Sequence, residues 1–444
     1  MAGWEPVFRK RSYPDNNLER DGDSILEYRA YSNDHHDIAR IAIELMPSES
    51  QIPITSFSAS RRFAARLALF YAAIFALAGC HLPFFSVWLR AVGIDAAWIG
   101  VISAVPAVTR FTVLPLVTNL AERHAAVRGA IVMTAVITTF GFIAIGTQHL
   151  PVAVFLAYAV TAAAWSPTIP LTDAYALRGV VRYGLDYGPV RLWGSAAFII
   201  GALGCGWLAD LIAAKHLIWI IATTAGLGAV ISLGLQPLDG HKAQAPVREG
   251  SVALLRDPGF LAIIAASALI QSSHSTYYVF GSITWQLAGL GGLTIAALWT
   301  LGVVAEIVVF ALSPRFTLQP STLVVIGGVG AVARWLITAQ EPPVAVLAVV
   351  QLAHGLSFGL TQVGIMGLMV RHVPIPVVTR AQGYLAACGG IVASSASIVS
   401  GMLYARYGQG AYYAMAAMAL SGVVVMWSAR RYVSAQPQSA ASGG

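Results

Sequence analysis

Long apolar runs separated by short polar stretches dominate the chain from residue 64 onward. Each run can cross a hydrocarbon core about 30 Å thick, for which roughly 20 helical residues suffice. The pattern predicts an all-α membrane protein with twelve spanning helices. The first six cover residues 64–89, 96–117, 129–147, 152–177, 192–213 and 217–235, and the second six cover 260–287, 293–312, 321–337, 344–370, 381–404 and 411–427.

Polar segments mark the expected domain boundaries. The first 60 residues are polar, mixed in charge and free of the apolar core that a signal peptide needs. We interpret them as a disordered cytoplasmic tail. The predicted domains are this tail (1–60), an N-terminal six-helix bundle (61–235), a cytoplasmic linker (236–258), a C-terminal six-helix bundle (259–432) and a second disordered tail (433–444).

Composition excludes a soluble protein. Hydrophobic residues make up 57% of the chain, charged residues only 11%, and the mean hydropathy is +0.70, whereas soluble domains carry roughly a quarter charged residues. The net charge of +7 does not indicate nucleic-acid binding, because the basic residues fall in short loops between apolar runs. Cys80, Cys205 and Cys388 lack the spacing of a metal site or disulfide framework. We expect no metal and no cofactor.

The loops also predict the orientation, because Lys and Arg stay preferentially on the cytoplasmic side during insertion. One side carries only Arg90, Lys215 and Arg406. The other carries Arg61, Arg62, Arg66, Arg123, Arg128, Arg178, Arg182, Arg191, Lys242, Arg248, Arg256, Arg315, Arg371, Arg380, Arg430 and Arg431. We therefore expect both termini and the linker on the cytoplasmic side of a bacterial inner membrane.

The two halves of the chain repeat each other at an offset of about 195 residues. His81 and His274 each begin a His-x-x-aromatic-aromatic motif, and Arg178 corresponds to Arg371. Two parallel repeats imply a pseudo-two-fold axis along the membrane normal and a binding site between the bundles. In this register Arg110 falls opposite Glu306.

Glu306 is the strongest candidate for proton coupling. It lies near the middle of an apolar helix, where a charge costs at least about 2.5 to 3.5 kcal/mol and persists when it is paired, hydrated or used. A protonated carboxyl tolerates a dry site, whereas an ionised one requires a cation. A static salt bridge is the alternative interpretation. Arg110 is predicted to be either the partner of Glu306 or the anchor of an anionic substrate, since its guanidinium binds carboxylates through a planar fork.

Two further charged residues have structural interpretations. Arg334 adjoins Trp335 near the predicted periplasmic end of its helix, where a long side chain can reach the interface at little cost. We predict an interfacial anchor. Asp173 follows two prolines that disrupt the fourth helix. It is predicted to form a gate salt bridge with Arg178, Arg182 or Arg191, with a role in proton coupling as the alternative.

Neutral polar and aromatic residues complete the candidate substrate site. Gln271, His274 and Tyr277 lie together in the seventh helix, His354 lies in the tenth and Trp165 in the fourth. The histidines either contact substrate or bond between helices, where each bond contributes about 0.6 kcal/mol on average. The aromatic rings either stack on a planar substrate or pack within the bundles.

Several motifs resemble one known family. The stretches that begin at His81, Ser166, Asp186, His274 and Leu298 are similar to the phenylpropionate permease branch of the major facilitator superfamily, the proton symporters for 3-phenylpropionic acid. The resemblance extends from about residue 62 to 432 and implies the major facilitator fold. The loop after the second helix keeps the charges that can latch a cytoplasmic gate but lacks the superfamily's glycines. These charges are Glu122, Arg123 and Arg128.

We therefore predict a secondary transporter and not an enzyme. The expected activity is proton-coupled uptake of a small carboxylated, aromatic acid-like solute by alternating access. A nucleoside or sugar symporter, a drug exporter and a non-transporting membrane sensor are the alternatives. The expected partners are the solute, protons and the lipid bilayer, with no nucleic acid and a monomeric state.

Overall fold

The computed structural model describes residues 57–185, 187–238, 254–374 and 377–434. All regular structure in these ranges is helical. The first half comprises α2 (Phe57–Ala91), α3 (Ala96–Arg123), α4 (Val127–Gly146), α5 (Pro151–Trp165), α6 (Thr168–Tyr183), α7 (Tyr187–Leu211), η1 (Ala214–His216) and α8 (Leu217–Leu233). The second half comprises α10 (Pro258–Ser272), α11 (Ser275–Leu287), α12 (Gly292–Leu312), η2 (Ser313–Arg315), α13 (Pro320–Thr338), α14 (Val344–Leu352), η3 (Gly355–Leu360), α15 (Thr361–His372), α16 (Val378–Tyr407), η5 (Gly408–Gly410) and α17 (Ala411–Ser434).

The helices agree with the apolar runs, with differences at their ends. The predicted N-terminal tail reaches residue 60, but α2 already begins at Phe57. The rest of that tail, residues 1–56, lies outside the described residues, as do most of the predicted linker (239–253) and the end of the C-terminal tail (435–444). Apolar stretches thus predict the positions of helices well. Where the first turn of a helix contains polar residues, its start is not predicted from them.

Ten stretches of the described chain are long and apolar enough to cross a membrane. One of them, Arg380–Val433, is 54 residues long and contains both α16 and α17. The helices α10 and α11, which have 15 and 13 residues and are separated by a break, are not among the ten. The protein is therefore an all-helical, multi-pass membrane protein.

Three of the predicted helices are interrupted. The break between α5 and α6 at Ser166–Pro167 is the one that the prolines predict. The break between α10 and α11 at Ser273–His274 contains no proline, and neither does η3, a π-helical turn between α14 and α15. Irregular turns of this kind are frequent at functional sites. Both unpredicted irregularities lie beside the polar cluster described below.

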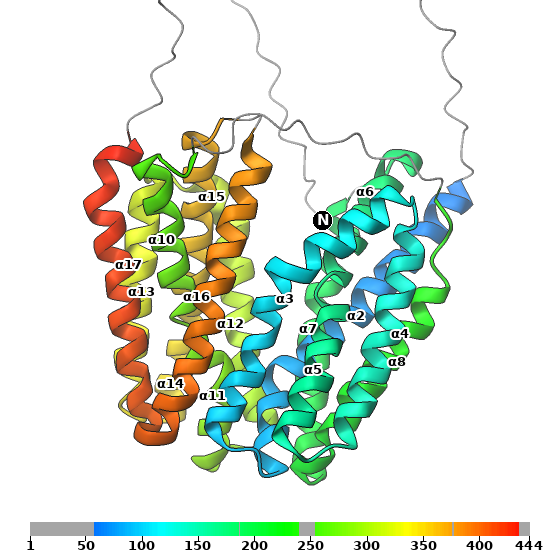
Figure 1. Cartoon of the computed structure of the whole chain (residues 1–444), viewed down its shortest axis with the longest axis horizontal. Coiled ribbons are helices and arrows are strands. Elements are labelled where there is room, and N and C mark those ends of the chain that lie inside the picture. Colours follow the sequence, from blue (N-terminus) through cyan, green and yellow to red (C-terminus); the bar gives the residue numbers. More distant parts are fainter. Residues whose placement is uncertain (1–56, 186, 239–253, 375–376, 435–444) are drawn as a thin grey trace, which may run out of the picture. The chain divides into compact units, whose positions relative to one another are not determined.

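The two halves contact each other mainly along α3 with α16 and along α7 with α12. Figure 1 shows α3 and α16 side by side between the two groups of helices. A Cβ added at Gly206 would lie 2.6 Å from the carbonyl oxygen of Gly292, and one at Gly401 would lie 2.7 Å from that of Ala96. Gly206 and Gly401 thus allow the backbones of the two halves to approach closely.

A carboxylate reinforces the contact between α7 and α12. Asp210, at the end of α7, accepts hydrogen bonds from the backbone N–H groups of Gly292 at 2.5 Å and Leu293 at 2.9 Å. These groups open the first turn of α12, whose own N-cap residue, Gly291, has no side chain to offer. We call this end of the bundles the Asp210 end. The opposite end, where Arg61 and Arg123 lie, is the arginine-rich end.

The ribbons of the two halves lie closer together at the Asp210 end than at the arginine-rich end (Figure 1). Close contacts between the halves nevertheless continue inward along α3. A Cβ at Gly390 of α16 would lie 2.4 Å from the ring of Phe111 and 3.0 Å from the carbonyl oxygen of Ala107. The halves are thus joined from the Asp210 end to the interior of α3.

Candidate functional site

Glu306 lies beside His354. The carboxylate oxygen Oε2 of Glu306 in α12 is 3.7 Å from Nε2 of His354, which stands between α14 and η3. Glycines allow this approach: a Cβ at Gly355 would lie 2.7 Å from the carbonyl oxygen of Ala305, and one at Gly359 would lie 3.6 Å from Cγ of Glu306. The π-helical turn therefore packs directly against α12, with the Glu306 side chain still 25% exposed.

Arg334 lies behind His354 and is buried, with 1% of its surface exposed. Its Nη1 donates to Nδ1 of His354 at 2.8 Å and to Oγ of Ser357 at 3.3 Å. Its Nη2 donates to Oε1 of Gln351 at 2.9 Å, and its Nε donates to the carbonyl oxygen of Val350 at 3.0 Å. The prediction of an interfacial anchor is wrong, because these hydrogen-bond acceptors hold Arg334 inside the bundle.

The guanidinium of Arg334 fixes the proton positions around it. Arginine only donates hydrogen bonds, so Nδ1 of His354 must accept, and the proton of neutral His354 is on Nε2, facing Glu306. Nδ1 of His274 lies 3.2 Å from the carbonyl oxygens of both Ile270 and Gln271, which only accept, so this nitrogen carries the proton. Nε2 of His274 therefore accepts from the hydroxyl of Ser357 at 3.1 Å. Arg334 fixes the tautomer of His354, and backbone carbonyls fix that of His274.

No carboxylate of the described chain lies within ion-pair distance of Arg334. Arginine remains charged at any relevant pH, and its charge is buried among neutral acceptors. Glu306, reached through His354, is the carboxylate connected to it. Aromatic rings complete the surroundings, because the guanidinium carbon is 4.6 Å from the ring centres of both Tyr277 and Trp335.

The cluster has a buried layer and a half-buried layer. His274, Tyr277, Arg334 and His354 are buried. A second set of side chains is partly accessible and covers this layer. These are Gln271, Tyr278, Glu306, Phe358 and Gln362. As substrate contacts, His274, Tyr277 and His354 remain predictions, and in this structure each contacts neighbouring protein groups.

Arg110 is exposed on α3, a helix that contacts α11 of the other half. The described residues contain no ion pair between Arg110 and Glu306. The predicted pairing of these two side chains is therefore absent from this conformation, in which His354 is the neighbour of Glu306. The role of Arg110 as a substrate anchor stays a prediction.

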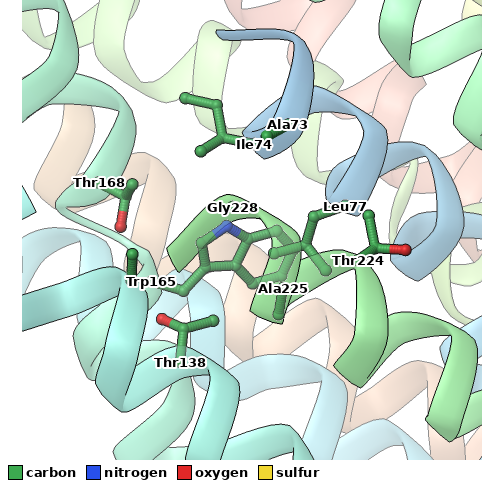
Figure 2. Close-up of a pocket in the computed structure, with 10 residues that line it drawn as sticks. Ala73, Ile74, Leu77, Thr138, Trp165, Thr168, Thr224, Ala225 and Gly228 are labelled. Carbon is green, nitrogen blue, oxygen red and sulfur yellow. The ribbon is translucent and has the colours of Figure 1, made fainter. Parts of the chain in front are cut away.

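Trp165 belongs to a separate cluster in the first half. Its ring meets the edge of His81 at 4.7 Å, and the His81 ring also stacks on Phe85 and bonds the hydroxyl of Tyr158 through Nε2 at 3.0 Å. Figure 2 shows the Trp165 indole extending across a small hollow between α2, α4 and α8. The lining is apolar apart from threonines and the indole N–H. Trp165 is therefore not part of the Arg334 cluster.

The two clusters correspond at an offset of 193 residues. His81, Phe85 and Trp165 become His274, Tyr278 and Phe358, and the ring contacts are repeated. Phe142 becomes Trp335, and both pack on the histidine. Gly141 and Thr161, which touch each other in the first half, become Arg334 and His354. Arg334 and His354 thus occupy the positions of a glycine and a threonine.

Asp173 lies in a third cluster, which is partly exposed. It accepts hydrogen bonds from the hydroxyls of Tyr71 at 2.6 Å and Tyr187 at 2.9 Å, and Nε of Arg191 is 3.9 Å away. The Arg191 guanidinium also covers the Phe75 ring at 4.1 Å. Arg191 is one of the three arginines predicted to reach Asp173, and it forms this ion pair.

The other predicted gate residues do not form one group. Arg128 donates to the carbonyl oxygens of Leu235 and Leu233, and so holds the end of α8. No ion pair joins Glu122 to Arg123 or Arg128 in the described residues. The same part of the chain contains no group of three or more His, Cys, Asp or Glu side chains suited to a metal ion.

Comparisons with known proteins agree with this architecture. The model of the MFS_1 like family matches residues 64–415. A probable 3-phenylpropionic acid transporter of Escherichia coli (strain K12) is 31% identical over 362 residues, which are 80% of this chain and 94% of the relative. A maltose permease of Geobacillus stearothermophilus is 28% identical over 78% of this chain and 89% of its own length.

Solved structures of transporters share the fold. The nucleoside transporter NupG superposes with a TM-score of 0.70 at 16% identity, covering 84% of this chain and 100% of its own. A D-xylose-proton symporter superposes with a TM-score of 0.64 at 11% identity, covering 84% of this chain and 98% of its own. At these identities the similarity shows the fold alone.

Proposed function

Because the chain belongs to the MFS_1 like family of major facilitator transporters, we propose that it couples the entry of a small carboxylated, aromatic acid-like solute to the entry of protons. It is a multi-pass membrane protein and a secondary transporter, not an enzyme. The proposal concerns the solute, the coupling ion and the residues that connect them.

We further propose twelve membrane crossings. The 54-residue span at the C-terminal end supplies two of them, and α10 with α11 supplies one more. The distribution of arginines supports cytoplasmic termini in a bacterial inner membrane, so that the arginine-rich end faces the cytoplasm. The transporter acts as a monomer in this proposal.

The observation that carries the proposal is the connection from Glu306 through His354 to Arg334. With Glu306 ionised, its charge and that of Arg334 compensate each other. With Glu306 protonated, the cluster carries a net positive charge and attracts an anion. Protonation therefore favours binding of a carboxylate, and by reciprocity the bound carboxylate favours protonation. This coupling is what symport of an acid anion with a proton requires.

Arg110 and the aromatic side chains support the solute class. Arg110 is exposed on a helix that contacts α11 of the other half, so it can contact a solute carboxylate through its planar fork. Tyr278 and Phe358 offer partly accessible rings to a planar group. The 3-phenylpropionic acid transporter among the relatives agrees with this class.

A nucleoside or sugar is the second candidate class, favoured by the nucleoside, maltose and xylose transporters among the relatives. Drug export by the same fold and a non-transporting sensor are the remaining alternatives. An uptake screen of aromatic acids, nucleosides and sugars in proteoliposomes separates these classes. We expect 3-phenylpropionate to accumulate, and its exclusion in favour of uridine or maltose would overturn the carboxylate proposal.

Glu306→Gln tests the coupling. The amide keeps the shape of the protonated carboxyl but cannot release a proton, so we expect loss of accumulation under a pH gradient while exchange of labelled for unlabelled solute continues. Proteoliposome uptake with and without the gradient measures both. Normal gradient-driven accumulation by the variant would contradict the assignment of Glu306.

Arg110→Ala tests the solute anchor. Removal of the guanidinium deletes the fork that is proposed to hold the carboxylate, so we expect the affinity for 3-phenylpropionate to fall at least about tenfold. Thermal stabilisation of the purified protein by the acid measures the affinity. Arg406, exposed at the Asp210 end, provides the control variant Arg406→Ala, and equal affinity in both variants would remove Arg110 from the site.

A further inference from the structure

Two glutamines form a hydrogen-bonding pair at the edge of the Arg334 cluster. Gln271 in the last turn of α10 donates through Nε2 to Oε1 of Gln362 in the first turn of α15, at 3.1 Å. The other amide end of Gln271, Oε1, is inaccessible and has no hydrogen-bond partner. A buried polar atom without a partner destabilises the folded protein. The pair is therefore incomplete as a purely structural element.

The incompleteness does not depend on how the amides are oriented. A carboxamide has a donor end and an acceptor end, and which is which is assigned from its partners. If both amides were turned, Gln362 would donate to Gln271, and the orphan of Gln271 would be a donor instead of an acceptor. In both arrangements the pair has one unused acceptor and one unused donor. It suits a neutral group that both donates and accepts.

The corresponding positions in the first half are apolar. At the offset of 193 residues, Gln271 corresponds to Ala78 and Gln362 to Ile169. That half folds into the same arrangement of helices around His81 without an amide pair. The glutamines are therefore not needed to build the six-helix unit.

The pair adjoins the proposed solute site. The carbonyl oxygen of Gln271 accepts from Nδ1 of His274 at 3.2 Å. Phe358, one helical turn before Gln362, contacts the rings of both His274 and His354. Gln271 and Gln362 are themselves partly accessible, as are Phe358 and Glu306. A group bound by the pair would lie at the rim of the cluster.

We propose that Gln271 and Gln362 determine specificity by binding a hydroxyl or carboxamide group of the solute, in addition to the carboxylate held elsewhere. The inference rests on the proposed function, because it assigns a second contact to the same solute. A hydroxyl suits either unused end, since it can donate one hydrogen bond and accept another. A site built in this way rejects an analogue that lacks the group, because the protein atoms are then left unpaired.

The test compares 3-phenylpropionate with 3-(4-hydroxyphenyl)propionate and 3-(3-hydroxyphenyl)propionate. Affinities are measured by thermal stabilisation of the purified full chain. In the unchanged protein we expect one hydroxylated acid to bind at least about tenfold more tightly than the parent. In Gln362→Met the preference should fall to within about twofold, while Ile169→Met, the same side chain at the corresponding position of the first half, should retain it.

The outcomes separate the two proposals. Binding of all three acids with the same ratios in the unchanged protein and in Gln362→Met overturns the role of the amide pair and leaves the carboxylate class intact. Binding of none of the acids overturns the carboxylate class. In that case uridine and 2′-deoxyuridine, measured on the same three proteins, decide whether the pair binds a hydroxyl. Equal ratios there overturn the inference as well.

Discussion

Each half of the chain surrounds a histidine, His81 or His274, with aromatic rings in the same arrangement, which we call the aromatic frame. Only the frame around His274 encloses a charge. Around His81 the polar groups are neutral, and Gly141 touches Thr161. Around His274 the corresponding positions hold Arg334 and His354, which bond each other at 2.8 Å. Residues that the halves share build the common bundle, whereas Arg334 and His354 occur in the second half alone and are not needed to build it.

Arg334→Leu should cause the largest loss of uptake and of thermal stability. The change leaves acceptors of His354, Gln351 and Val350 buried without their Arg334 donors, and a buried acceptor left unpaired costs about 1 to 3 kcal/mol. We expect no measurable uptake and a lower thermal midpoint, measured in proteoliposomes and by scanning fluorimetry. Arg406→Leu, an exposed site, should change neither, and a harmless Arg334→Leu would show that the network has no role.

His354→Gln and His81→Gln test whether the two aromatic frames differ in their contribution to proton coupling. His354 connects Glu306 to Arg334, whereas His81 bonds a tyrosine hydroxyl. We expect at least about a tenfold loss of gradient-driven accumulation in His354→Gln, with exchange retained, since tenfold corresponds to 1.4 kcal/mol of coupling. His81→Gln should stay within about threefold on both readouts. Equal losses of accumulation in the two variants would mean that both frames contribute equally to proton coupling.

Tyr158→Phe should have the smallest effect. It removes the single hydrogen bond to Nε2 of His81 and preserves the ring packing on Phe85. A buried neutral hydrogen bond contributes about 1 kcal/mol net, so we expect a slightly lower thermal midpoint and uptake within about twofold of the unchanged protein. A large loss of uptake would place the first-half frame in the transport pathway.

Sequence alone predicted the helices and the repeat well. Apolar runs and basic loops depend on local composition, and the helices follow them from α3 to α17. The break at Ser166–Pro167 was equally local. The breaks at Ser273–His274 and in η3 were not predicted, because no proline or glycine pair marks the first, and the second depends on packing of Gly355 against α12.

The site was predicted in part, and the errors have a common origin. Glu306, His274 and His354 were recognised as polar residues in apolar helices, but the position of Arg334 near a helix end favoured an interfacial location. Its true surroundings come from the tenth segment, where Gln351, His354 and Ser357 recur every three residues. That spacing puts three acceptors on one helical face, and it was the signal available for a buried arginine. Partners across helices depend on tertiary contact, which a single sequence does not display.

The carboxylate of Asp210 has a consequence for the direction in which the molecule opens. The helix α3 is capped by its own Asp95, which accepts from the N–H of Trp98 at 3.0 Å and travels with the helix. In α12 the N-cap residue is Gly291, and the carboxylate of Asp210 in the other half accepts the hydrogen bonds of the first turn. Separation of the halves at the Asp210 end would uncap α12, at a cost of about 1 kcal/mol, or roughly fivefold in population. This cap therefore contributes to closure at that end whether or not solute and proton are bound.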